Sequence, residues 1–198
     1  EAIDPVRVIT NRSTGKMGAA LAKEALLMGA TVTVVSGPAS EPLPSGAEVI
    51  PVKSAQQMHD ALHGKFTEAD ICIMAAAVSD YRPATVSETK IQRNEAGKLV
   101  LELVPNPDIS ASLGKIKGKR LLVGFSLESG DSENRALEKM KKKGCDLIIF
   151  NRADDALGTK TTKAVILGKN GFREEIPTMD KGVAAKIMLQ IIAEKLGA

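Results

Sequence analysis

The sequence predicts one α/β domain, a doubly wound, Rossmann-like three-layer sandwich in which helices cover both faces of a largely parallel sheet. Three observations lead to this fold class. Apolar, β-rich segments alternate along the chain with segments of helical periodicity. The 198 residues suit a single domain with a sizeable core, and no repeat or linker divides them. With 3% aromatic residues and no Trp, that core has to consist of Ala, Val, Ile, Leu and Met, as is usual for a parallel sheet between helices.

The first half of the chain is expected to alternate extended segments with two helices. A helix over residues 17–28 places apolar side chains on one face. Gly29 is placed to end this helix, because glycine adopts the left-handed conformation at little cost. The extended segments are 6–10, 31–35, 48–52 and 70–77, and the second helix is 55–62.

The second half continues this pattern and closes with a hairpin and a long helix. A helix from about Ser132 to Lys143 is expected to end at Gly144. Asp180 is expected to cap the last helix, whose apolar residues recur at helical spacing. The expected strands are 121–125 and 147–150, followed by 163–167 and 171–176 on either side of a turn at 169–171.

Residues 84–104 interrupt the alternation of strands and helices. Segments 90–93 and 99–103 are separated by a turn at 94–97, which predicts an inserted β-hairpin. A hairpin near the ends of parallel strands is well placed to act as a flap over a site or as an arm that contacts a partner.

Composition and residue context exclude several functional classes. The net charge is only +3, and one Tyr and four Phe are too few for a typical nucleic-acid surface. We therefore expect no nucleic acid as a partner. No apolar stretch is long enough to span a bilayer, so we expect no membrane partner either, and we expect a cytoplasmic location. Cys72 and Cys145 lie in apolar runs and are predicted to be buried, reduced and inert. His59 and His63 are predicted to be surface residues and not metal ligands.

Two candidate ligand-binding segments follow expected strands, at the carboxyl edge where open α/β sheets bind their ligands. Residues 10–18 lead into a helix, and their exposed N–H groups together with the helix dipole could bind an anion. A simple N-cap by Ser13 or Thr14 explains the same residues. In residues 75–83, three alanines allow a planar ligand to approach, and Asp80 could accept from hydroxyls or hold a metal ion. A packed strand end with an Asp turn is the alternative there.

Two further segments could bind phosphate. Asn106 as N-cap and Pro107 at the first helical position predict another helix start. Lys139 and Lys143 lie four residues apart on one helix face and could reach one phosphate chain, although lysines in a last turn often only complement the helix dipole. The residues alone therefore predict a nucleotide- or phosphate-binding domain.

Two kinds of protein could use such a nucleotide-binding domain: a nicotinamide-dependent reductase, or a nucleotide-binding module without catalytic activity. The turn at 14–18 lacks the Gly-x-Gly-x-x-Gly pattern, and Ser36–Gly37 stand where an acidic residue would bind the ribose. The sequence also has no Tyr-x-x-x-Lys pair and no P-loop. These features argue against the reductase but leave the silent module open.

A series of motifs in matching order covers essentially the whole chain. The motifs are 3–7, 11–18, 35–38, 75–81, 90–91, 106–109, 123–125, 139–143, 146–147 and Asn151. Together they closely resemble bacterial phosphopantothenate–cysteine ligases, also called phosphopantothenoylcysteine synthetases, which form the synthetase domain of bifunctional coenzyme A biosynthesis proteins. Thr14 stands where Ser is commoner in the family, a change that keeps the hydroxyl.

The resemblance implies a two-step ligation in coenzyme A biosynthesis. The carboxylate of 4′-phosphopantothenate attacks the α-phosphate of CTP, which gives an acyl-cytidylate and pyrophosphate. The amine of L-cysteine then displaces CMP to form 4′-phosphopantothenoylcysteine. Mg²⁺ accompanies the nucleotide, as suits the neutralisation of departing phosphates. The choice of CTP over ATP comes from the resemblance alone.

The resemblance also implies roles for individual residues. Asn11 is expected to stabilise the acyl-nucleotide, and Lys90 on the flap to close over it and help convert it. Arg7 and Ala77 are expected to bind substrate beside Asn11. The nucleotide-binding residues are expected to be Met74, Ala75, Ala76, Asp80, Lys90, Asn106, Pro107, Asp108, Ile109, Phe125, Lys139 and Lys143.

The wider context implied by the resemblance is a homodimer fused behind, or associated with, a flavin-dependent decarboxylase. Family members carry a strand and a Gly-Gly-Thr turn just before the position of Glu1. We therefore expect residues 1–198 to be one ligase domain, with that first strand missing and with a longer protein as its source.

Overall fold

The centre of the structure, a computed structural model, is a five-stranded mixed sheet with the strand order β3-β6-β7-β8-β9. The parallel part consists of β3 (Ile71–Met74), β6 (Leu121–Glu128) and β7 (Leu147–Arg152). It continues into the antiparallel strands β8 (Thr161–Gly168) and β9 (Arg173–Asp180). The structure describes all residues except 94–96, 129–132, 153–159 and 198.

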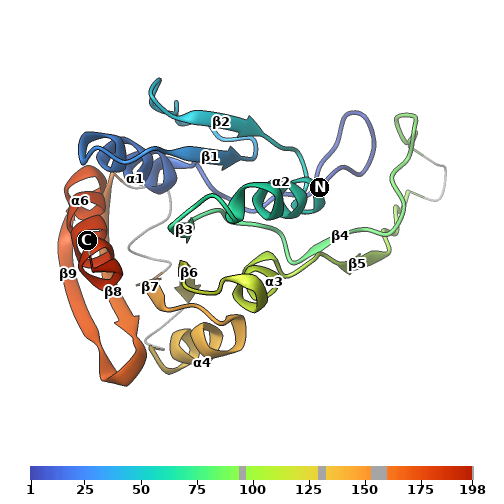
Figure 1. The fold of residues 1–198 in the computed structure, drawn as a ribbon. Coiled ribbons are helices and arrows are strands. Elements are labelled where there is room, and N and C mark those ends of the chain that lie inside the picture. The colour runs from blue at the N-terminus through green and yellow to red at the C-terminus, as the bar shows by residue number, and fades with distance from the viewer. Residues whose placement is uncertain (94–96, 129–132, 153–159, 198) are drawn as a thin grey trace.

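Helices cover both faces of this sheet (Figure 1). One face carries α1 (Lys16–Leu27) and α6 (Lys181–Leu196), which pack against each other. The other carries α2 (Ala55–Phe66), α3 (Ile109–Ile116) and α4 (Glu133–Lys143). This arrangement confirms the predicted α/β class with a helical layer on each side.

Strand β6, which lies between β3 and β7, is buried on both faces. Val123 belongs to the apolar cluster under α1 and α6, and its neighbour Leu122 to the cluster under α2, α3 and α4. In β7, Ile149 and Ile148 divide between the two clusters in the same way. A strand with helices on both sides has no polar face, which is why these segments read as continuous apolar runs.

The sheet is split, which differs from the continuous doubly wound sheet that the alternation predicts. β1 (Thr33–Ser36) pairs in parallel with β2 (Glu48–Pro51) as a separate two-stranded sheet. Within the described residues no strand joins β1 to β3. β3 also ends at Met74, so the predicted strand 70–77 is shorter at its carboxyl end.

Residues 6–10 were expected to be extended, and this prediction is wrong. They belong to a loop in which Ala2 and Val8 form an isolated antiparallel bridge. The chain reverses at Asp4, because its side chain accepts hydrogen bonds from the backbone N–H groups of Val6 and Arg7. The reversal leaves too few residues for a strand.

The predicted flap is a hairpin only at its base. β4 (Tyr81–Pro83) and β5 (Leu103–Pro105) pair antiparallel, whereas 90–93 and 98–102 are not in strands. Val100 is 88% exposed, so the outer part of this arm has no core to pack on. Of the predicted turn at 94–97, only Gly97 lies within the described residues, and it has a φ of 69°.

Several predicted element ends are confirmed. Gly29 and Gly144 have positive φ at the ends of α1 and α4, and Asp180 caps α6 by accepting from the N–H of Gly182. The turn between β8 and β9 has Asn170 and Gly171 in the left-handed region. The predicted start of α4 at Ser132 lies outside the described residues.

A glycine sets how closely α3 and α4 approach. A Cβ atom at Gly114 would lie well inside van der Waals contact with the backbone oxygen of Lys143. No side-chain rotation relieves a clash with a backbone atom, so a larger residue would force the helices apart.

We therefore predict that Gly114→Ala lowers the free energy of unfolding by about 1–3 kcal/mol, the usual cost of overpacking. Gly64→Ala is the matched control, because Gly64 also lies in a helix but has nothing within 4 Å of the position that a methyl group would take. The control is expected to be neutral or to stabilise by about 0.5–1 kcal/mol. Urea unfolding of the two variants measures this, and an equal effect of both would contradict the close contact.

Asp146 ties three elements together at the amino ends of β6 and β7. Its carboxylate accepts from Lys117 at the end of α3, from Lys169 in the β8–β9 turn at 3.1 Å, and from the Leu122 N–H at 3.0 Å. Burial raises the pKa of Asp146, but these donors outweigh burial and hold its pKa below the ordinary value.

A depressed carboxyl pKa stabilises the fold above the unfolded pKa of 3.8, and this stabilisation is lost as the pH falls through the lower folded value. We predict that Asp146→Asn costs about 1–3 kcal/mol at pH 7, as expected for hydrogen bonds to a charged group. The difference from wild type should narrow as unfolding is measured towards pH 3. Asp70→Asn, at an exposed aspartate, should have little effect at either pH.

Candidate functional site

Three of the predicted segments meet at the loop that follows β3. Asn11, from the loop before α1, donates from Nδ2 to the backbone oxygens of Ala77 at 3.3 Å and Val78 at 3.1 Å. Asn106, from the loop before α3, donates from Nδ2 to the Ser79 oxygen at 2.9 Å. Two asparagine amides thus hold the loop beyond the carboxyl end of β3 from either side.

Arg82 fixes the orientation of the Asn106 amide. Its Nη1 donates to the Asn106 Oδ1 at 3.2 Å and to the Pro105 oxygen at 2.6 Å. The predicted N-cap role of Asn106 is therefore wrong. Asp108 caps α3 instead, and accepts from the Ala111 N–H at 3.1 Å, because the helix begins only at Ile109.

The start of α1 has no side-chain cap. Gly15 occupies the N-cap position with a φ of 79°, and Ser13 and Thr14 make only contacts of 3.4 and 3.5 Å to the N–H groups of Gly15 and Lys16. The simple N-cap by Ser13 or Thr14 is thus not found. First-turn N–H groups without a cap are compatible with an anion at this helix end.

A second cluster links the loop before α1 to the flap. The Asp4 side chain accepts from the N–H groups of Val6 and Arg7 at 2.8 Å each and from that of Ile91 at 3.2 Å. Arg7 donates from Nη2 to the Ile91 oxygen at 2.8 Å, and its Nη1 lies 3.4 Å from the Asp4 carboxylate. The predicted substrate residue Arg7 is therefore bound next to Lys90 on the flap.

The Asp4 carboxylate is charged at neutral pH. Asp4 is only 2% exposed. Its burial raises the pKa, but the three backbone N–H groups and the Arg7 guanidinium outweigh burial and place the pKa of Asp4 below its ordinary value.

The two lysines of α4 contact different partners. Lys139 Nζ lies 3.5 Å from the Ser126 hydroxyl, and Lys143 Nζ lies 3.5 Å from the Asp108 carboxylate. That the two lysines reach one phosphate chain stays a prediction. The Lys143–Asp108 ion pair does bring the end of α4 to the start of α3, beside Asn106.

The remaining predicted site residues differ in exposure. Ala76, Asp80 and Lys90 are exposed. Phe125 and Ala75 pack into the cluster under α1 and α6, whereas Met74 packs into the opposite one. Pro107 is half-buried and Ile109 is buried at the start of α3.

The cysteines and histidines are not part of this cluster. Cys72 and Cys145 are free thiols, and burial raises the pKa of both to about 11, which keeps them protonated and unreactive. His59 and His63 are partly exposed on α2, with 24% of the His59 side chain accessible. His63 contacts the Ser112 hydroxyl at 2.9 Å, and burial lowers its pKa.

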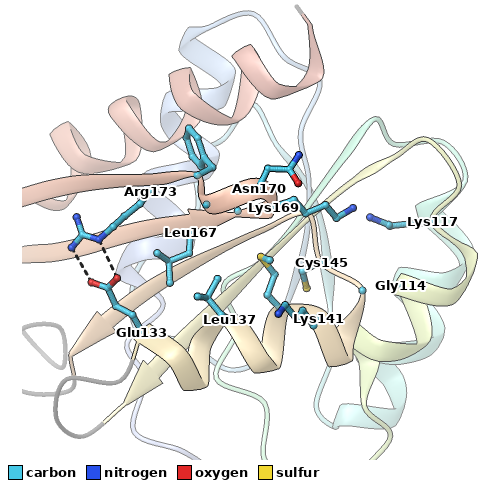
Figure 2. Close-up of a pocket in the computed structure, with 15 residues that line it drawn as sticks. Gly114, Lys117, Glu133, Leu137, Lys141, Cys145, Leu167, Lys169, Asn170 and Arg173 are labelled. Atoms are coloured by element: carbon cyan, nitrogen blue, oxygen red, sulfur yellow. Dashed lines mark hydrogen bonds and ion pairs between the residues drawn. The ribbon is translucent and has the colours of Figure 1, made fainter.

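A pocket of about 750 Å³ lies elsewhere, between α4 and the β8–β9 hairpin (Figure 2). Leu137 and Leu167 face each other across it, and Arg173 and Glu133 form an ion pair with distances of 2.9 and 3.0 Å at one end. At the other end, Lys117 and Lys169 are both neutralised by Asp146. The pocket contains none of the predicted site residues, so it is distinct from the loop cluster.

The donor set for Mg²⁺ is sparse. The described residues contain no group of three or more His, Cys, Asp or Glu side chains that could hold a metal ion. Mg²⁺ that accompanies a nucleotide needs only one or two carboxylates besides the phosphates. The exposed Asp80 at the loop cluster fits that limited role.

Sequence reasoning missed Arg82, at the loop after β3, and Asp4, which contacts the flap. Arg82 has no sequence signal that distinguishes it from any surface arginine. Asp4 could have been identified as a turn residue from the Asp-Pro-Val-Arg pattern, because Asp commonly accepts from N–H groups two and three residues ahead. Its contact with Ile91 could not, since it joins residues 87 positions apart.

Comparisons with known proteins match the whole chain. Residues 1–196 match the family described as the DNA/pantothenate metabolism flavoprotein C-terminal domain. The chain is 43% identical over 198 residues to the coenzyme A biosynthesis bifunctional protein CoaBC of Bacillus subtilis (strain 168), with 98% of this chain and 48% of that protein covered. It is 44% identical to a prokaryotic cysteine/cysteine sulfinic acid decarboxylase, and the match covers 97% of this chain and 55% of that protein. The chain thus spans about half the length of the curated relatives it matches.

Solved structures agree with this match. The crystal structure of the C-terminal domain of a CoaBC protein has a TM-score of 0.85 and 35% identity, and covers 100% of this chain and 90% of that one. A mutant of Cab2 in complex with phosphopantothenate-cysteine has a TM-score of 0.77 at 17% identity, and the match covers 99% of this chain and 82% of that one. At this identity the likeness is one of fold alone. These findings confirm the predicted family, and the chain belongs to the C-terminal domain family of the DNA/pantothenate metabolism flavoproteins, with the CoaBC C-terminal domain among its members.

Proposed function

We propose that this chain is a phosphopantothenate–cysteine ligase domain that couples 4′-phosphopantothenate to L-cysteine through an acyl-cytidylate. One observation carries the proposal: the match to a CoaBC protein covers 98% of the chain at 43% identity, and the motifs of the family stand in order. The meeting of three of those motifs at the loop after β3 supports it.

The first step forms an activated acyl group. The phosphopantothenate carboxylate oxygen bonds to the α-phosphorus of CTP while the bond to the β-phosphate oxygen breaks, and pyrophosphate leaves. Asn11 lies at the loop after β3 and offers an amide that can hydrogen-bond the acyl-nucleotide. The uncapped start of α1 is a suitable place for an anionic group of a substrate, since its N–H groups and helix dipole favour negative charge.

The second step forms the amide. The cysteine amine attacks the acyl carbon, the carbon–oxygen bond to the phosphate breaks, CMP leaves with the electron pair, and the amine nitrogen gives up one proton to solvent. Lys90 is exposed on the flap, and among the described residues its ammonium has no hydrogen-bond or ion-pair partner. It is therefore available to neutralise the phosphate that departs.

The nucleotide requires counter-charges. Lys139 and Lys143 are assigned to the phosphates, which would replace Ser126 and Asp108 as their partners. Mg²⁺, when bound, would supply further neutralisation, with Asp80 as its candidate ligand. The choice of CTP follows from the family resemblance.

The wider setting of the domain is also a proposal. Relatives of about twice this length are bifunctional CoaBC proteins, which supports a fusion to a flavin-dependent decarboxylase. A homodimer and a cytoplasmic location are proposed with it. None of the described helices is long and apolar enough to pass through a bilayer.

The first test measures pyrophosphate release after mixing the protein with 4′-phosphopantothenate, Mg²⁺ and either CTP or ATP, with and without cysteine. We expect release that requires phosphopantothenate and CTP. Binding of NADPH is measured in parallel as the test of the reductase alternative.

Either outcome is informative. Release that depends on phosphopantothenate supports the ligase and identifies its nucleotide. A folded protein that binds nucleotide and releases nothing, also with its natural flanking sequence, would replace the ligase by a silent nucleotide-binding module.

Two substitutions test the assigned roles. Asn11→Ala and Lys90→Ala are each expected to reduce amide formation at least a hundredfold, because each removes a group that contacts the intermediate. Chromatographic detection of phosphopantothenoylcysteine measures this, and the melting temperature should stay within a few degrees of wild type.

Matched controls are available for both. Arg93→Ala removes another exposed flap cation, and Asn134→Ala another exposed asparagine, so both should retain activity. Turnover like that of wild type in Asn11→Ala or Lys90→Ala removes that residue from the mechanism.

A further inference from the structure

Asp4 and Arg7 together bind the backbone of one residue in the flap. The N–H group of Ile91 donates to the Asp4 Oδ2 at 3.2 Å, and its carbonyl accepts from the Arg7 Nη2 at 2.8 Å. Asp4 and Arg7 are themselves paired at 3.4 Å. Both polar backbone groups of Ile91 are thus bound by one ion pair from a distant loop.

These contacts are strong for their kind. The Asp4 side chain is completely shielded from solvent, and hydrogen bonds to a charged acceptor are stronger than neutral ones. The Ser87 N–H also donates to the Ile3 oxygen at 3.0 Å, so the same loop holds the flap at a second point. This end of the flap is fixed, whereas Val100 on its other arm is almost fully exposed.

Fixing Ile91 restricts Lys90. Adjacent Cα atoms are about 3.8 Å apart, so the backbone of Lys90 can move little while Ile91 is held. The loop that holds Ile91 also carries Asn11, four residues after Arg7. We propose that Asp4 is a positioning residue for Lys90: with Arg7 it holds the Ile91 backbone and so directs the Lys90 ammonium to the site that contains Asn11.

The role of Lys90 in this inference rests on the proposed ligase function. The contact of Asp4 and Arg7 with the Ile91 backbone is independent of that function. A merely structural role would be that Asp4 only folds its own turn through Val6 and Arg7. The two carboxylate oxygens separate these roles, since Oδ1 accepts from Val6 and Arg7 and Oδ2 from Ile91.

Asp4→Asn is therefore a selective probe. The amide oxygen can still accept from Val6 and Arg7, while the amide nitrogen places a donor against the Ile91 N–H and the Arg7 guanidinium. The turn should survive and the contact with the flap should be lost. Arg7→Lys tests the same contact from the other side, because the single lysine nitrogen cannot replace Nη2 at the Ile91 oxygen and Nη1 at Asp4 in the same geometry.

The first readout is independent of activity. Hydrogen–deuterium exchange of residues 87–93 is expected to be at least about tenfold faster in Asp4→Asn and in Arg7→Lys than in wild type, since a charge-assisted hydrogen bond is lost. Glu88→Gln removes an exposed acid from the same segment and should exchange like wild type. Unchanged exchange in both variants would overturn the proposal.

The second readout separates the two chemical steps. In single-turnover experiments, Asp4→Asn should release pyrophosphate within about twofold of the wild-type rate and form the amide at least about tenfold more slowly. An equal loss in both steps would show a merely structural role. If the wild-type protein makes no amide at all, the ligase function fails, and the exchange of residues 87–93 still decides whether Asp4 holds the flap.

Discussion

The burial of β6 on both faces is the constraint on which the rest of the structure depends. Because Leu122 and Val123 face opposite apolar clusters, a helical layer is required on each side of the sheet. The parallel register of β3 and β6 pairs Met74 with Gly124. Because the two strands are parallel, the loop after β3 and the last residues of β6, which continues to Glu128, lie at the same carboxyl edge of the sheet.

The elements of this core could be predicted because their sequence signals are local. Apolar runs, helical spacing and the glycines at positions 29 and 144 identify strands, helices and helix ends without knowledge of distant residues. The errors lie where the outcome depends on long-range partners. Residues 6–10 look like a strand but form only an isolated bridge to Ala2, and the flap segments have β-rich composition but no core beneath them.

The same distinction applies to the candidate site. The position of Ala77 at the carboxyl edge followed from the expected strand β3, and Asn11 and Asn106 meet the same loop there, although the strand expected before Asn11 is not formed. The contacts of Arg82 with Pro105 and Asn106 and of Asp4 with Ile91 did not, because they join residues far apart in the sequence. A side chain that binds a peptide group recognises no particular partner residue, so the sequence carries no trace of the pairing.

The split between β1 and β3 has a practical consequence for solution studies. Within the described chain, each of these strands hydrogen-bonds a neighbour on only one edge, and open edges of this kind recruit strands from other molecules. Association through such edges has no fixed stoichiometry and grows with concentration. A functional dimer has a defined mass. Light scattering over a range of concentrations would therefore be needed before any oligomer of this chain is assigned to its biology.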